Sequence, residues 1–191
     1  MRFYLLIAIA VILIMVTGLG ACARPIETPT SSQTPESKFS KPFTLTSSAF
    51  KNGEAIPQHH WNPSCGQENV SPQLSWSGAP AETKAFALIV DDPDPAPILH
   101  WVVYGMSANQ TELPEGVEAN NNIIFGASGR GGTGWWGPCP PEGMGPHTYV
   151  FTLYALSEKV DLAQGANSRE LLTAIEGKVI ATAVLTGTAE R

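Results

Sequence analysis

The apolar residues of this chain come in short segments separated by proline, glycine and asparagine, and this pattern limits the possible folds more than any other feature. Six segments that alternate or are rich in β-branched and aromatic residues, all shorter than typical helices, are found at residues 43–50, 73–78, 84–92, 100–106, 148–156 and 178–187. The third is a continuous apolar run that ends in two aspartates, as a buried strand would. Many short strands with such turns predict an all-β fold, a β-sandwich or a barrel.

One helix is expected near the C-terminus. Asn167 or Ser168 is the expected N-cap, Glu170 lies in the first turn, and Gly177 ends the segment. Between them, Leu171, Leu172 and Ile175 form the expected apolar face.

The N-terminal segment indicates export. Residues 1–21 have one basic residue, Arg2, followed by a long apolar run, which is the shape of a signal peptide. The alternative, a retained membrane anchor, needs about 20 apolar residues, and this run is shorter. The sequence LGAC that ends at Cys22 resembles the bacterial lipobox, so we expect Cys22 to be lipidated. An acyl chain there would anchor the protein in the cell envelope, at the outer membrane if the cell has two membranes.

A disordered tether is expected at residues 22–42, which are rich in proline, serine and threonine. The folded domain is expected at residues 43–191, a length that suits a single core. The formal net charge of the chain is −6, which argues against a nucleic-acid-binding protein, since such a protein would carry a basic face.

Three motifs that would indicate a cofactor, a metal or a catalytic nucleophile are incomplete or absent in this sequence. The glycines of GRGGTG at 129–134 match a dinucleotide-binding fingerprint, but the proline-rich segment that follows them cannot open the helix which that motif needs. His59, His60 and Cys65 lack the spacing of a zinc motif, so no metal site is expected. No nucleophile elbow is present either. The sequence therefore predicts neither an enzyme nor a bound cofactor.

The most unusual stretch is GWWGPCPPEGMGPH at residues 134–147, whose prolines exclude a helix or a central strand. It leads into a strand in which His147 and Tyr149 point to the same face. Acidic residues follow the strand at 84–92, and His100 opens the next strand. Two histidines, a tyrosine hydroxyl and backbone amides could together bind one oxyanion; the alternative is that each residue is only structural.

Five stretches in the expected order carry a resemblance to a known family: CGQENVSPQLSWSGAP, DPDPAPILHWVVYG, LPEG, GPCPPEGMGPHTYVFTLYAL and IEGKVIATAVLTG. They resemble the phosphatidylethanolamine-binding protein family, in particular its bacterial Raf-kinase-inhibitor-like branch, over about residues 43–191. The resemblance implies a two-sheet antiparallel β-sandwich with a Greek-key element and one or two peripheral helices. It also implies an anion-binding pocket made by Asp92, Asp94, His100, Pro140, Pro141, Gly143, His147 and Tyr149.

The chain departs from the family pattern at two positions. Pro95 is inserted directly after Asp-Pro-Asp, where the family usually reads Asp-Pro-Asp-Ala-Pro, and Thr148 stands where the family usually has arginine. In a strand, Thr148 would face away from His147 and Tyr149, so its effect on the pocket is expected to be small.

Two cysteines remain if Cys22 is lipidated. Outside the cytoplasm, Cys65 and Cys139 could form a disulfide that tethers the proline-rich loop to residues 65–72; two buried free thiols are the alternative.

These observations predict an envelope lipoprotein that binds a small phosphate-bearing ligand or a phospholipid head group, with a proton on a histidine or on the ligand relieving the repulsion from the aspartates. The alternative function is a protein-interaction module, such as a protease or kinase inhibitor, with Trp135 and Trp136 as an exposed interface. A hydrolase is the least favoured function.

Overall fold

The computed structural model describes residues 41–94 and 97–191. The predicted signal peptide, Cys22, nearly all of the predicted tether and Pro95 lie outside the described residues. Within the described part, no helix is both long enough and apolar enough to cross a membrane.

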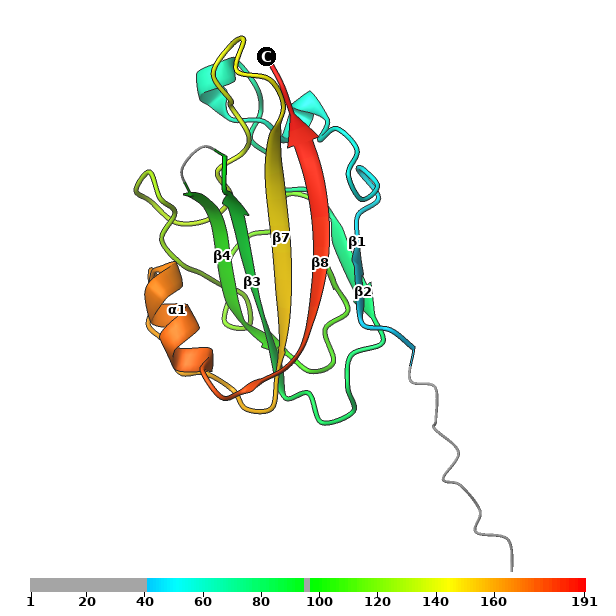
Figure 1. Cartoon of the computed structure of the whole chain (residues 1–191). Coiled ribbons are helices and arrows are strands. Elements are labelled where there is room, and N and C mark those ends of the chain that lie inside the picture. The colour runs from blue at the N-terminus through cyan, green and yellow to red at the C-terminus, as the bar shows by residue number, and fades with distance from the viewer. Residues whose placement is uncertain (1–40, 95–96) are drawn as a thin grey trace, which may run out of the picture. The chain divides into compact units, whose positions relative to one another are not determined.

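Two antiparallel sheets form the domain, which confirms the predicted all-β fold (Figure 1). The smaller sheet has the strand order β1 (Thr44–Thr46), β2 (Leu74–Ser77) and β5 (Glu112–Leu113). The larger sheet has the order β6 (Ile124–Phe125), β4 (Ile98–Ser107), β3 (Ala85–Asp92), β7 (His147–Leu156) and β8 (Val179–Ala189).

The central strand β3 is buried on both faces, which explains its continuous apolar sequence. Phe86 and Leu88 belong to the main core, where the ring of Trp76 from the smaller sheet meets Phe86 with 5.4 Å between ring centroids. Ala87 and Ile89 point to the other face and pack in a second cluster with the helix. Alternate residues of one strand thus serve two cores, and the two sheets and the helix form three layers.

The helix α1 (Ser168–Ile175) begins where the sequence predicted. The Asn167 side chain accepts a hydrogen bond from the Glu170 amide, and the Glu170 carboxylate accepts one from the Asn167 amide, which makes a capping box. Leu171 is fully buried against the larger sheet. The prediction for Leu172 was wrong, because its side chain is 46% exposed and lies beside the buried stripe.

Four short elements were not predicted: the two-residue strands β5 and β6, and the 3₁₀ helices η1 (Gln58–His60) and η2 (Pro63–Cys65). Segments of two or three residues are too short to show a hydrophobic period. Figure 1 shows the 3₁₀ helices in cyan at the same end of the larger sheet as the yellow loop that precedes β7.

Candidate functional site

A small pocket lies where three strands of the larger sheet meet. Antiparallel pairing sets Asp92 at the end of β3 opposite Ile98 at the start of β4, and sets Asp91 opposite Val150 near the start of β7. The strand ends therefore share one edge with the proline-rich loop. The pocket has a volume of about 140 Å³ and is lined by Asp92, Asp94, Ile98, His100, Arg130, Trp136, Cys139, Pro140, Pro141, His147 and Tyr149.

Seven of the eight residues predicted for the pocket line it, and Gly143 does not. The Gly143 amide donates a hydrogen bond to the carbonyl oxygen of Arg191 (3.0 Å), in a turn where its φ of 73° suits glycine. Gly143 thus shapes the loop and lies outside the pocket lining. Sequence reasoning missed Ile98, Arg130, Trp136 and Cys139, of which Arg130 is the cation of the pocket lining.

Asp92 and His147 form a buried pair inside the pocket. The His147 Nδ1 lies 2.7 Å from Asp92 Oδ2, and the two residues are only 5% and 2% exposed. The other Asp92 oxygen accepts the Asp94 amide at 2.9 Å, and Asp94 accepts the Thr148 amide at 3.2 Å. Because Asp92 is engaged through both oxygens, it orients the His147 ring and closes the turn after β3.

His100 is the one pocket residue with a buried polar atom left unpaired. Its Nδ1 donates to the carbonyl oxygen of Trp136, while no described residue hydrogen-bonds its Nε2, which is buried. Burial lowers the pKa of His100 more than the hydrogen bond to Trp136 and the charge of Asp92 raise it, so the ring is neutral near pH 7. With the proton held on Nδ1, Nε2 carries a lone pair and accepts a hydrogen bond.

Tyr149 adds a donor beside this acceptor. Its ring meets the His100 ring edge-on, with 5.0 Å between centroids. Burial and the negative charge of Asp92 raise the pKa of Tyr149 well above its usual value, so the hydroxyl keeps its proton. A hydroxyl that keeps its proton can donate one hydrogen bond to a ligand.

The proline-rich loop that forms one wall is held from several sides. Cys139 forms a disulfide with Cys65, with 5.7 Å between their Cα atoms. The Asn69 side chain donates to the Trp135 carbonyl oxygen (3.1 Å) and accepts the Gly137 amide (2.8 Å). From the chain end, the Arg191 Nε donates to the Pro140 carbonyl oxygen at 2.9 Å. These bonds from distant segments stiffen a loop that has no regular structure of its own.

The prediction that Trp135 and Trp136 form an exposed aromatic surface was wrong. Trp135 is only 9% exposed, its Nε1 donates to the His60 carbonyl oxygen at 2.9 Å, and its ring stacks on Phe151. Trp136 is half-buried, lines the pocket and supplies the carbonyl that orients His100. The aromatic pair is therefore part of the core and of the pocket wall.

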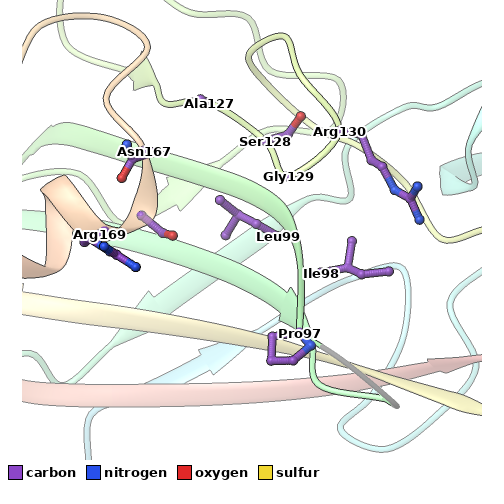
Figure 2. Close-up of a pocket in the computed structure, with 10 residues that line it drawn as sticks. Pro97, Ile98, Leu99, Ala127, Ser128, Gly129, Arg130, Asn167 and Arg169 are labelled. Atoms are coloured by element: carbon purple, nitrogen blue, oxygen red, sulfur yellow. The ribbon is translucent and has the colours of Figure 1, made fainter.

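A larger cavity of about 610 Å³ adjoins the pocket and shares Ile98 and Arg130 with it (Figure 2). Arg130 and Arg169 lie on opposite sides of this cavity, Arg130 on the loop at 127–130 and Arg169 in the first turn of α1. Arg130 thus lines both the pocket and the larger cavity, and Arg169 lines the larger cavity alone. Residues 135–146, directly after the glycines at 129–134, form no helix, as the sequence predicted.

Comparison with known proteins gives consistent relatives. A family model described as "Phosphatidylethanolamine-binding protein" matches residues 46–190. The chain is 40% identical over 151 residues to a "UPF0098 protein" of Methanothermobacter thermautotrophicus, which covers 76% of this chain and 97% of the relative. It is also similar to the crystal structure of E. coli YbcL, which is titled a new member of the mammalian PEBP family. The TM-score is 0.73, the sequence identity is 34%, and the match covers 78% of this chain and 98% of YbcL.

One further match extends toward the N-terminus. A protein of Mycobacterium tuberculosis named "Putative lipoprotein LppC" is 35% identical over 192 residues, covering 93% of this chain and 92% of the relative.

Proposed function

Because the chain belongs to the phosphatidylethanolamine-binding protein family, we propose that its pocket binds a small phosphate-bearing ligand or a phospholipid head group. The observation that carries the proposal is the buried, unpaired Nε2 of His100 beside the free hydroxyl proton of Tyr149. A buried acceptor without a partner costs about 1–3 kcal/mol, and a ligand that donates to it recovers that cost.

A singly protonated phosphate monoester fits this set of groups. Its hydroxyl donates to His100 Nε2, while its charged oxygens accept hydrogen bonds from Tyr149 and attract Arg130. The ligand proton also lowers the repulsion from the nearby aspartates. Because the second pKa of a phosphate monoester is near ~6, such a ligand supplies the proton itself at mildly acidic pH.

The dimensions of the two hollows suggest how a longer ligand is placed. A pocket of about 140 Å³ is smaller than the ~300–1,000 Å³ of sites that enclose whole drug-sized ligands, so it takes a head group. The rest of the ligand would extend past Arg130 into the larger cavity toward Arg169.

We propose a binding protein rather than an enzyme. Of the residues that line the pocket, Cys139 is the one with a nucleophilic sulfur, and it is engaged in the disulfide. Neither histidine of the pocket is paired with a serine, threonine or cysteine side chain. The alternative, a protein-interaction or inhibitor module, placed its interface on Trp135 and Trp136, and the burial of Trp135 removes that surface.

Calorimetric titration with phosphoethanolamine tests the binding proposal. Tyr149→Phe removes the donated hydroxyl and should weaken binding about tenfold or more, since hydrogen bonds to charged groups contribute ~1.5–3 kcal/mol. Tyr154→Phe is the matched control, because Tyr154 lies on the same strand outside the pocket and should leave the affinity unchanged. Equal affinities of the two variants would refute the pocket assignment.

We further propose that the chain is an envelope lipoprotein anchored through Cys22. Residues 43–191 make up 78% of the chain, so a match to LppC that covers 93% extends into the N-terminal segment. Labelling of growing cells with a fatty-acid analogue should modify the chain, and Cys22→Ser should abolish the label. Label that persists in Cys22→Ser would refute the anchor.

A further inference from the structure

Three side chains outside the pocket converge on one point of the surface. His59 and His60 come from η1, and Glu115 follows β5, more than fifty residues later in the chain. One potential ligand atom of each lies within 4.8 Å of the others, and within the described chain no other group of three histidine, cysteine or acidic residues does the same. His59 Nε2 already lies 3.3 Å from Glu115 Oε1.

The two histidine rings are oriented as metal ligands are. His60 Nδ1 donates to the Val70 carbonyl oxygen at 2.8 Å, which leaves a lone pair on Nε2. His59 Nδ1 lies 3.1 Å from Glu68 Oε2, which leaves its Nε2 toward Glu115. Histidines that bind metals commonly donate the other ring N–H to a carbonyl or a carboxylate, and here the two rings have one acceptor of each kind.

The spacing needs little adjustment to hold an ion. Tetrahedral zinc with bonds of about 2.0–2.2 Å places neighbouring ligand atoms roughly 3.4 Å apart. The His59–Glu115 separation of 3.3 Å already has this value. His60 is 2% exposed and fixed in place, whereas the Glu115 side chain is 52% exposed and free to turn toward it.

We propose that His59, His60 and Glu115 form a binding site for Zn²⁺, with both Nε2 atoms and one carboxylate oxygen as protein ligands. Two imidazoles and a carboxylate suit zinc better than Mg²⁺ or Ca²⁺, which prefer oxygen ligands.

The site is independent of the anion pocket but lies behind one of its walls. The His60 carbonyl accepts the Trp135 indole N–H, and a Cβ added at Gly137 would meet that same carbonyl at 2.1 Å. A metal that fixes η1 thus fixes the surface against which the pocket wall packs. Zinc that binds only the folded chain also raises its stability in proportion to the logarithm of zinc concentration.

The test uses the full chain in mild detergent with Zn²⁺ as the probe. Calorimetry should show one Zn²⁺ per chain, and among the four histidine side chains the NMR signals of His59 and His60 should shift while those of His100 and His147 stay. Glu115→Gln should weaken binding at least tenfold. Glu118→Gln, an exposed glutamate three residues later, is the control that should bind as the parent does.

Either of two results would overturn the site. One is an absence of binding at 100-fold molar excess of Zn²⁺ over the chain, which would leave His59 as a simple ion-pair partner of Glu68 and Glu115. The other is stoichiometric binding that Glu115→Gln leaves unchanged, or that shifts only His100 and His147. Because Glu115 is exposed, its substitution does not threaten the fold.

Discussion

The disulfide between Cys65 and Cys139 should account for a large share of the stability of the domain. The two residues are separated by 74 positions in the sequence, so the bond closes a long loop in the unfolded chain. The loop-entropy relation gives a loss of about 15 cal/mol/K for a loop of this length, or about 4.5 kcal/mol at 25 °C. Native domains are stable by only ~5–15 kcal/mol in total.

Denaturation in guanidinium chloride, with and without a reducing agent, measures this contribution. The oxidised chain should exceed the reduced chain by about 4.5 kcal/mol in free energy of unfolding. The Cys65→Ser/Cys139→Ser variant should match the reduced parent and should not respond to reductant. A difference below about 1 kcal/mol between the oxidised and reduced parent would refute the reasoning, because the bond would then restrain little.

Three further outcomes are expected. Asp92→Asn should lower the free energy of unfolding by about 1–3 kcal/mol, because the buried partner of His147 loses its charge. Asp91→Asn, at the partly exposed neighbouring residue, should change the free energy of unfolding little. Chemical denaturation of both variants checks this. Arg130→Gln should weaken phosphoethanolamine binding two- to fivefold at low salt, as the loss of an exposed charge does. Arg169→Gln, outside the small pocket, should leave the binding of inorganic phosphate intact. Calorimetry at two ionic strengths measures both affinities. The stability of the ligand-free chain should fall as the pH drops below about 6.5, because burial lowers the folded-state pKa of His100 and the unfolded chain takes up the proton first. Thermal unfolding from pH 8 to pH 5 measures this, and a stability that rises toward pH 5 would contradict it.

The main elements of the fold could be predicted because their local signals agree with their burial. β3 is apolar from Ala85 to Val90 because it is covered on both faces. The helix α1 begins at a capping box made by Asn167 and Glu170, two residue types that are typical of helix starts. The two-residue strands could not be predicted, because their pairing depends on partners such as Ser75 and Val103 in other segments.

The pocket could be predicted as far as strand ends define it. Asp92 and His147 lie at the ends of strands, and His100 lies two residues inside one, in segments that the sequence marks clearly as strands. Arg130 comes from a glycine-rich loop whose path is set by long-range backbone contacts, such as that of the Gly129 amide with the Leu99 carbonyl oxygen at 2.9 Å. No local sequence pattern predicts that this loop packs beside β4.

The error at Trp135 has a physical cause. Trp135 stands among prolines and glycines, which indicates a surface loop, yet its side chain enters the core because Phe151 and the His60 carbonyl provide partners. The position of Glu115 likewise has no signal in the sequence, since only the fold brings its side chain beside His59. Loop residues take their environment from segments far along the chain, so sequence spacing alone misplaces them.

The pH dependence of phosphoethanolamine binding tests the central claim most directly. If only the singly protonated phosphate binds, affinity should rise about 80-fold, or roughly 2.6 kcal/mol, from pH 8 to pH 5.5, given a phosphate pKa near ~6. The corresponding sulfate ester, which has no proton to donate to His100, should bind weakly at both values. Affinity for phosphoethanolamine that stays flat between pH 8 and pH 5.5 would contradict proton-coupled binding in this pocket.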